Sequence, residues 1–375
     1  MILKDGEKIE LLDINAVIQL GDIHFGLKSS NDNSIKYLEW MENMKGYFFD
    51  FFIPLVEKYK VKGYNPIIFI DGDFFDNRKT LRVDVINCAI DIVSAMTNIC
   101  KVAFCIGNHD TYFTDNNRVN SLRVFENMNN VYIVEKTARI KTGFAAFDII
   151  SWIENGIEES KLVKDSSADY LILHTDINGL KYPSNAKIEG RVEAKGFKGK
   201  HIYSGHIHKR QEKGKVTYIG SPYEIDKSDA GNIKGVYILR ADFIDDETGF
   251  DIMEDFIEND YSPRFVSYSV KELQEMKDSG KDIEKVLGNN YVSVKYESAD
   301  APKYKDIMNS LEGYGRGIEF FEIRDDVAVD DMDTEEIKSL SIDDAVYECI
   351  SQLDLTDEEK DFLNNKHKEY SKLTN

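Results

Sequence analysis

Cysteine and proline are both scarce in this chain of 375 residues, which has four cysteines and six prolines. The cysteines (Cys88, Cys100, Cys105 and Cys349) have neither the spacing of a metal site nor that of a redox motif, so we expect them to be reduced. No apolar run reaches about 18 residues, the length that a membrane-spanning helix needs. The N-terminus also lacks the apolar segment of a signal peptide. These absences predict a cytoplasmic protein without disulfide bonds and without a membrane segment.

Positive charge is also in deficit, with 47 Lys and Arg residues against 68 Asp and Glu residues. Spread evenly, the resulting net charge of −21 would disfavour a nucleic-acid partner. The charge is not spread evenly, because residues 1–240 contain 32 acidic and 32 basic side chains. The whole excess of acid therefore lies after residue 240, and the front of the chain is neutral before any metal binds.

Histidine is rare as well, but its few copies are concentrated. Six of the seven histidines lie between residues 24 and 208, and five of those six fall within a set of five short motifs. Each motif follows a short apolar run of the kind typical of a buried strand. Polar residues at the ends of successive strands converge on one edge of a sheet. The motifs are Gly21-Asp22-Ile23-His24, Gly72-Asp73-Phe74-Phe75-Asp76, Gly107-Asn108-His109-Asp110, His174 and Gly205-His206-Ile207-His208.

The motifs supply seven side chains of the types that hold two divalent metal ions. Taken alone, a Gly-His-x-His segment could be a surface loop and His174 a hydrogen-bonded core histidine, so the complete set carries the prediction. A carboxylate such as Asp73 can bridge two ions, and oxygen mixed with imidazole suits Mn²⁺, Fe²⁺ or Zn²⁺, of which we expect Mn²⁺. Two such ions activate water and neutralise the oxygens of a phosphoester. The predicted ligands are Asp22, His24, Asp73, Asn108, His174, His206 and His208.

The first 240 residues alternate predicted strands with predicted helices, which favours an α/β fold with two sheets and helices outside them. We expect those helices at 34–60, 82–98 and 118–129. Residues 241–260 contain nine acidic residues and no basic ones, as a boundary between domains would. We therefore expect a first domain over residues 1–240.

A smaller α+β unit is predicted after that boundary, so that a linker and a cap occupy residues 241–330. Its helices are expected at 270–287 and 302–312, and its strands at 291–296 and 318–323. A second acidic linker and two amphipathic helices, which begin at Ser341 and Thr356 with capping-box patterns, fill residues 331–375. These two helices could pack on their own domain or dock a partner helix.

The order of the motifs (Asp-x-His, Gly-Asp-x-x-Asp, Gly-Asn-His-Asp, His, Gly-His-x-His) resembles that of the calcineurin-like metallophosphoesterases. The resemblance implies a four-layer αββα sandwich with the small α+β cap and the C-terminal helix pair appended. It implies that His109 protonates the leaving oxygen as a general acid and that Asp76 orients His109. It also implies that Asp22, His24, Asp73 and His208 hold one metal ion, while Asp73, Asn108, His174 and His206 hold the other.

Within that family, the Asn-His-Asp block, Gly-His-Ile-His and residues 218–223 resemble the SbcD-type nucleases of double-strand-break repair. The similarity extends over nearly the whole chain to the recombination endonuclease subunits of T-even-like phages. It implies a metal-dependent DNA endonuclease or exonuclease that serves recombination, repair and replication in a bacterial host. It also implies a homodimer formed through helices after the second and third motifs, and an SbcC-like ABC-type ATPase that binds the C-terminal helices. Two departures are Asp76, where archaeal and eukaryotic relatives tend to have His, and the Leu-His-Thr-Asp context of His174.

Basic residues gather near the last two motifs. Residues 181–215 contain ten Lys or Arg and three Glu, a local charge of +7 that suits a phosphate backbone, although a solvated loop would look the same. Two other interpretations stay open: a phosphoesterase for small-molecule or protein substrates, and a scaffold without catalysis, which the intact ligand set disfavours. The candidate DNA contacts are Arg78, Lys79, Arg118, Lys195, Lys198, Lys209 and Arg210.

Overall fold

The structure is a computed structural model of the whole chain. It describes residues 1–26, 35–182, 186–245, 249–297, 304–311 and 318–323, together with the single residues 302, 360 and 366. The chain divides into two compact units, Met1–Phe321 and Glu322–Asn375, and nearly all of the described residues belong to the first. Apart from Lys360 and Lys366, the two C-terminal helices expected from Ser341 and Thr356, and also Cys349, lie outside the described residues.

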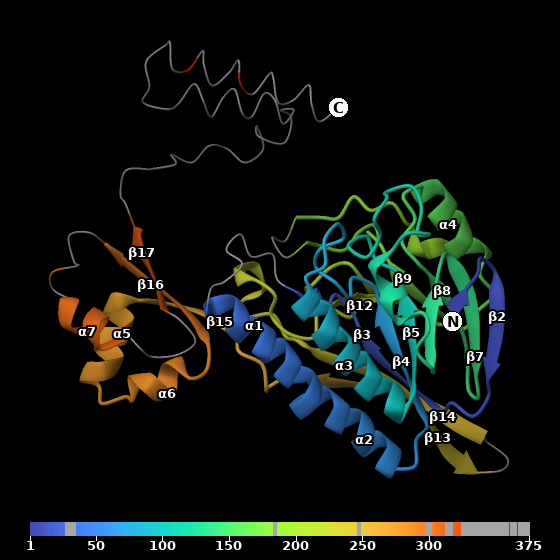
Figure 1. Ribbon diagram of the computed structural model, residues 1–375, viewed down its shortest axis with the longest axis horizontal. Helices are drawn as coiled ribbons and strands as arrows, with labels where there is room; N and C mark the ends of the chain where they lie inside the picture. Colours follow the sequence, from blue (N-terminus) through green and yellow to red (C-terminus); the bar gives the residue numbers. More distant parts are fainter. Residues whose placement is uncertain are drawn as a thin grey trace. The chain divides into compact units, whose positions relative to one another are not determined.

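Seven strands form the first sheet, in the order β1-β6-β5-β4-β3-β13-β14. Figure 1 labels β3, β4, β5, β13 and β14 of this sheet. Its central strands β3, β4 and β5 run parallel and are almost completely buried. Burial on both faces explains why these strands read as continuous apolar runs in the sequence. The strands are β1 (Ile2–Leu3), β3 (Ala16–Leu20), β4 (Pro66–Asp71), β5 (Lys101–Cys105), β6 (Val131–Val134), β13 (Gly235–Asp245) and β14 (Gly249–Glu258).

A second sheet of seven strands has the order β11-β12-β10-β9-β8-β7-β2. It packs on the first sheet through a shared core that includes Phe69 of β4 and Phe147 of β8, whose rings lie 5.3 Å apart. Two mixed sheets face to face confirm the predicted α/β sandwich. The strands are β2 (Glu7–Leu11), β7 (Thr137–Thr142), β8 (Ala146–Ile150), β9 (Tyr170–His174), β10 (His201–Gly205), β11 (Gln211–Lys213) and β12 (Val216–Tyr218).

Helices cover the outer faces of both sheets (Figure 1). On the first sheet, α1, a π-helical turn η1, α2 and α3 bury their apolar side chains in one core cluster with β3, β4 and β5. On the second sheet, Val163 of α4 packs with Leu171 and Ile202. The helices are α1 (Ile35–Gly46), η1 (Tyr47–Phe52), α2 (Ile53–Val61), α3 (Val83–Ile99) and α4 (Gly156–Asp165).

The prediction of a helix over residues 118–129 is wrong, since only a short 3-10 turn, η2 (Ser121–Phe125), forms there. Leu122 and Phe125 of this turn are fully buried, so the apolar spacing that predicted a helix reflects the core. Asparagines at 127, 129 and 130 then favour turn conformations over helix. Asn130 itself has a left-handed backbone, with φ of 64°.

The acidic segment 241–260 forms strand rather than linker in the described residues. β13 continues to Asp245 and pairs with β14 along its whole length, so these residues complete the edge of the first sheet. Arg240 pairs with Asp242 and with Asp255, and Tyr203 donates to Glu254 at 2.7 Å. Charged side chains on an edge strand also oppose pairing with other chains. How the chain divides into domains stays a prediction.

The predicted α+β cap has its own three-stranded sheet, in the order β15-β16-β17. Leu273, Val294 and Ile307 form part of its separate core. The helix expected over 270–287 is two helices, because Gly280 takes a left-handed φ of 80° between them. The elements are β15 (Phe265–Ser269), α5 (Val270–Asp278), α6 (Ile283–Leu287), β16 (Tyr291–Glu297), α7 (Lys305–Leu311) and β17 (Ile318–Ile323).

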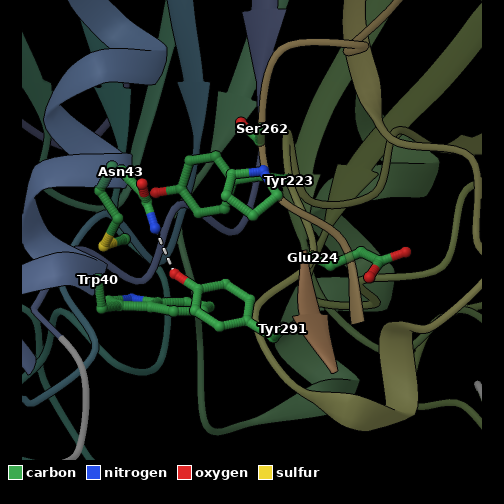
Figure 2. A pocket seen from close by; sticks show the side chains of 8 residues that line it. Trp40, Asn43, Tyr223, Glu224, Ser262 and Tyr291 are labelled. Carbon is green, nitrogen blue, oxygen red and sulfur yellow. Dashed lines mark hydrogen bonds between the residues drawn. The ribbon is translucent and has the colours of Figure 1, made fainter. Parts of the chain in front are cut away.

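The cap contacts α1 through aromatic side chains (Figure 2). The Trp40 ring lies 5.3 Å from the Tyr291 ring, and Asn43 donates to the Tyr291 hydroxyl. A pocket of about 10 Å³ remains at this seam, which leaves room for little more than a water molecule. Within the described part of the chain, no helix combines the length and apolar character needed to cross a membrane.

Candidate metal centre

The ends of five strands bring the five motifs to one edge of the sandwich. β3, β4 and β5 of the first sheet run parallel, and each is followed by one of the first three motifs. In the second sheet, β9 ends at His174 and the parallel β10 ends at Gly205, before His206 and His208. The two sheets therefore contribute candidate ligands to the same site from opposite sides.

One group of candidate ligands consists of Asp22, His24 and His208, whose ligand atoms all lie within 4.8 Å of one another. Nε2 of His24 and Nε2 of His208 are 3.2 Å apart. Asp22 is fully buried, and its Oδ1 accepts a hydrogen bond from the main chain of His206 at 2.7 Å. Its Oδ2 is buried and has no hydrogen-bond partner, as expected of an oxygen that faces a cation.

A second group consists of Asp73, His174 and His206, again within 4.8 Å. Asn108 joins it, because its Oδ1 lies 3.1 Å from Nε2 of His174 and 3.0 Å from Nδ1 of His206. Asp73 lies between the two groups: its Oδ2 is 3.1 Å from Nε2 of His174 and 3.6 Å from Nε2 of His24. This position is the one that a bridging carboxylate needs.

Backbone strain is concentrated at these residues. Among the described residues, five other than glycine have a positive φ, and four of these belong to the motifs: Asp22 (48°), His24 (47°), Asp73 (49°) and His206 (83°). Left-handed backbone is unfavourable for such residues and persists where the surroundings impose it. Each strained residue lies within four residues of a strand end, so the sharp turn aims its side chain into the site.

Two glycines permit the close packing of the motifs. A Cβ atom on Gly72 would lie 2.1 Å from Nδ1 of His174, and one on Gly107 would lie 2.1 Å from Oδ1 of Asp73. Both distances are far inside van der Waals contact. Glycine is therefore required at these positions because candidate ligands occupy the space that a side chain would fill.

The outer nitrogens of the imidazole rings face fixed acceptors. Nδ1 of His174 lies 2.8 Å from the main-chain oxygen of Asp71, and Nε2 of His206 lies 3.3 Å from a carboxylate oxygen of Asp176. A proton held on the outer nitrogen leaves the lone pair of the other nitrogen for a metal ion. With three carboxylate or amide oxygens at the centre, this donor set fits divalent cations of the Mn²⁺, Fe²⁺ or Zn²⁺ type.

The acid and base of the second group stabilise each other's charge. Burial works against ionisation of Asp73, but the charges of His174, His24 and His109 outweigh it and lower the pKa of the Asp73 carboxyl. Burial likewise works against a charged His174, but Asp73 outweighs it and raises the pKa of His174 to about 10. A metal ion that binds there must displace this proton, so metal affinity falls as the pH falls.

His109 lies at the rim of the site, with its ring 4.7 Å from that of His24. Its Nδ1 is 2.8 Å from the main-chain oxygen of Asp76. The Asp76 carboxylate lies instead 3.4 Å from Nδ1 of His24. Asp76 thus contacts His109 through its carbonyl, and Nε2 of His109 is the nitrogen that can serve a substrate.

Asp110 has a structural role that the Gly-Asn-His-Asp motif did not indicate. It is fully buried and accepts hydrogen bonds from the main chain of Gly107 at 3.0 Å and of Phe75 at 3.2 Å. Burial raises the pKa of this carboxyl to about 7. Asp110 therefore ties the second motif to the third.

Trp152 and Arg191 form one wall of the site; Arg191 belongs to the basic stretch 181–215, but neither residue was predicted to lie at the metal centre. The Trp152 ring lies 5.4 Å from the ring of His206, and the Arg191 guanidinium lies 3.9 Å from the Trp152 ring. Both come from loops far apart in the chain. Only the folded arrangement brings them together.

The candidate DNA contacts separate into two sets. Arg78 and Lys79 line a cavity of about 320 Å³ together with Asp76, Asn108 and His109, and Lys209 directly follows His208. Arg118 is exposed in the loop after the third motif.

The remaining candidates lie elsewhere or have partners. Lys198 precedes Gly199, which packs against the carbonyls of residues 168 and 169 at the start of β9. Residues 168 and 169 lie at the end of β9 opposite His174. Lys195 lies in the turn η3 (Ala194–Gly196) beside the C-terminal end of α4, at the same end of the sheet. Arg210 donates to the Tyr237 hydroxyl at 2.9 Å and lies over the Tyr237 ring. Its guanidinium is therefore already bound to another residue of the protein.

Glu159 of α4 supports a prediction about pH and stability. It is fully buried, accepts a hydrogen bond from Thr175 at 2.9 Å, and lies 3.7 Å from Arg191. Burial raises the pKa of this carboxyl to about 7. The folded protein therefore holds the proton more tightly than the unfolded chain, and stability should fall as the pH rises through about 5 to 7.

Replacement of Glu159 by glutamine should remove this dependence. At pH 8 we expect the metal-free variant to be more stable than the parent by at most about 3 kcal/mol, the equivalent of the pKa shift. Denaturant unfolding of the metal-free protein from pH 5 to 8 measures this. Glu158→Gln, which changes a half-exposed neighbour paired with Lys136, is the control. Parallel profiles for the parent and Glu159→Gln would contradict the prediction.

Comparisons with known proteins agree with this geometry. The family model for calcineurin-like phosphoesterases matches residues 16–210. "Exonuclease subunit 1" of Enterobacteria phage T4 is 27% identical over 242 residues, which cover 62% of this chain and 68% of that protein. "Putative phosphoesterase 244L" of Invertebrate iridescent virus 6 is 26% identical over 165 residues, covering 41% of this chain and 57% of that protein.

A solved structure and a third relative complete the comparison. "Putative phosphoesterase 078R" of Invertebrate iridescent virus 3 is 23% identical over 252 residues, or 62% of this chain and 65% of that protein. The crystal structure of a 5'-nucleotidase precursor from Thermus thermophilus matches with 12% identity and a TM-score of 0.31, covering 67% of this chain and 56% of that one. The family match spans more than half of the chain and includes all five motifs, from Asp22 to His208. The chain belongs to the calcineurin-like phosphoesterase family, and it is a metallophosphoesterase, a hydrolase of phosphoesters.

Proposed function

We propose that this chain is a two-metal DNA nuclease, the nuclease subunit of a recombination or repair complex. The observation that carries the proposal is the convergence of seven oxygen and imidazole donors beside His109 and a cation-lined cavity. In this proposal Asp73 would serve both ions. Asp22, His24 and His208 would complete one ligand set, and Asn108, His174 and His206 would complete the other.

The chemistry divides between the ions and the protein. When bound, the two ions, which we expect to be Mn²⁺, would supply water activation and charge neutralisation for phosphodiester hydrolysis. The protein orients each imidazole through its outer nitrogen. The carbonyl of Asp76 holds Nδ1–H of His109, so that Nε2–H of His109 can donate its proton to the leaving oxygen as a general acid.

Two cations favour a nucleic-acid substrate. Arg78 and Lys79 are exposed and lie in the cavity that Asn108 and His109 also line. A phosphodiester at His109 would place the neighbouring phosphates of a nucleic-acid strand within reach of these side chains. Such contacts position a strand without reading its sequence. The name of the T4 relative, an exonuclease subunit, supports the same substrate class.

A partner and a second copy belong to the same proposal. The T4 relative is named as a subunit, and we propose an SbcC-like ABC-type ATPase as the partner of the C-terminal segment. Large apolar side chains after the second and third motifs, including Val83, Tyr112, Phe113 and Val119, are exposed by 46% or more. The rings of Tyr112 and Phe113 lie 4.8 Å apart, and exposed apolar side chains that gather are typical of interaction sites. We propose that these residues contribute to a homodimer.

A phosphoesterase acting on small-molecule or protein phosphoesters is the alternative. Two viral relatives are named only as phosphoesterases, and nothing in the chemistry of the two ligand groups requires a nucleic acid. The alternative differs in one respect that can be measured. A small substrate would not need Arg78 and Lys79 beyond the reacting phosphate.

Hydrolysis assays with Mn²⁺ on linear double-stranded DNA, single-stranded DNA and an aryl phosphodiester separate the two functions. We expect DNA to be degraded, and Arg78→Ala/Lys79→Ala to slow DNA cleavage by roughly tenfold while sparing the aryl ester, because lost phosphate contacts weaken binding to a strand. Lys195→Ala/Lys198→Ala, which removes the two cations at the far end of the sheet, is the matched control. Cleavage of the aryl ester alone would overturn the nuclease proposal and leave the alternative.

A further inference from the structure

A buried ion pair lies behind the candidate metal centre, outside the seven candidate ligands. Nζ of Lys234 lies 2.7 Å from Oδ1 of Asp229. Lys234 is 3% exposed and Asp229 is fully buried. Asp229 closes a short 3-10 turn (Lys227–Asp229) and Lys234 directly precedes β13, so both belong to the connection between the second sheet and the first.

The remaining hydrogen bonds of Lys234 reach the loop that carries His208. Nζ donates to the main-chain oxygen of His208 at 2.8 Å and to Oγ of Ser221 at 2.7 Å. With Asp229, these contacts use all three N–H groups of the ammonium. The same His208 oxygen also accepts from the main chain of Ser221 at 3.1 Å. The backbone of His208 is therefore held from two directions.

Asp229 acts on the ring of the same histidine. Its Oδ2 lies 3.7 Å from Nδ1 of His208 and accepts a hydrogen bond from the main chain of Ile225 at 3.0 Å. At 3.7 Å the effect on the ring is electrostatic rather than a hydrogen bond. A negative charge on the Nδ1 side favours a proton there, which leaves the Nε2 lone pair facing Nε2 of His24.

Stability alone gives little reason to retain such a pair. The desolvation of two buried charges offsets most of their attraction, and apolar replacements of buried pairs are often neutral. Here one member of the pair fixes the backbone of His208 and the other orients its ring. Lys234 and Asp229 thus both contact His208 of the Gly-His-Ile-His motif. The other histidine of this motif, His206, faces Asp176, whose side chain is 19% exposed.

We propose that Lys234 and Asp229 are positioning residues for His208, so that their loss weakens the first metal position (Asp22, His24 and His208) and spares the second. The inference rests on the proposed function only in that the seven candidate ligands must hold two ions. It concerns metal binding, so its test does not depend on the substrate.

Titration of Mn²⁺ into the metal-free protein, followed by the electron spin resonance signal of free Mn²⁺, tests the proposal. Asp229→Asn keeps the size of the side chain and an acceptor for Ile225 while it removes the charge. Asp229→Asn/Lys234→Met removes both charges, so that neither is left buried alone. We expect both variants to bind one Mn²⁺ as the parent does and the other about 10- to 100-fold more weakly, as loss of partners behind metal-binding histidines generally causes.

Two controls give the result its meaning. Lys227→Met removes an exposed ion pair with Glu319 in the same connection and should leave both ions unaffected. Asp176→Asn should weaken the ion that His206 holds. Variants that fold, as judged by cooperative thermal unfolding, and bind both ions as the parent does would overturn the inference. A parent protein that binds fewer than two ions would overturn the proposed function instead.

Discussion

Replacing Asp73 by asparagine is expected to abolish the stabilisation of the protein by Mn²⁺. Asp73 is the only candidate ligand whose carboxylate lies between both groups, 3.1 Å from His174 and 3.6 Å from His24. At a Mn²⁺ concentration about 100 times the dissociation constant, the parent should gain about 2.7 kcal/mol. The variant should gain almost nothing, and its hydrolytic rate should fall by roughly 10³-fold, equivalent to about 4 kcal/mol of barrier.

The substitution is chosen to leave the fold intact. Asparagine keeps the volume of the side chain and an oxygen that can accept the hydrogen bond from the main chain of His109. Asp148→Asn is the matched control, because Asp148 is also a carboxylate held in hydrogen bonds, with Arg139 and Ser166, but lies away from the site. The melting temperature with and without Mn²⁺ is the measurement. An undiminished Mn²⁺ shift in Asp73→Asn would show that the ions bind elsewhere.

Replacing His109 by alanine is expected to lower kcat by about 10² to 10⁴-fold while metal binding is retained, which is the range for loss of a general acid. His109 belongs to neither the group with Asp73 nor the group with His208, although its ring nitrogen lies within 4.8 Å of ligand atoms of His24 and Asp76, and its Nδ1 is occupied by the carbonyl of Asp76. The loss should depend on the leaving group. A substrate that leaves as a stable aryl oxide needs little protonation, whereas a nucleoside alkoxide needs it fully.

The leaving-group comparison distinguishes proton donation from a structural effect. His201→Ala is the matched control, because His201 is the histidine of this region that lies outside the motifs, bonded to Thr217 at 2.8 Å. It should not change either rate. Equal losses for DNA and for a nitrophenyl ester in His109→Ala would contradict the general-acid role.

Much of the fold was predictable because the central strands are buried on both faces. β3, β4, β5, β9 and β10 each contain a short apolar stretch that the sequence shows, interrupted in β3 by Gln19 and limited in β10 to Ile202 and Tyr203, and each is followed by its motif. The edge strand β14 was not predicted, since its acidic residues face solvent or partners such as Arg240. Local composition there describes a surface, and the pairing with β13 that makes it a strand is a long-range property.

The candidate metal ligands were predictable from the sequence, but the residues that hold those ligands in position were not. The candidate ligands follow strand ends, which the order of the sequence reveals. The residues behind them, such as Lys234 and Asp229, act through contacts with another segment of the chain and belong to no motif. The +7 charge of residues 181–215 shows the same limit, because strand direction separates Lys198 from His174 although both are close in the sequence.

Crystals soaked with Mn²⁺ and measured at the manganese absorption edge would show directly whether these seven residues hold two metal ions. We expect two anomalous peaks per chain, one on either side of the Asp73 carboxylate. One should be surrounded by Asp22, His24 and His208, and the other by Asn108, His174 and His206. A single peak, or a second peak away from Asp73, would contradict the assignment of these seven residues as the ligands of two metal ions.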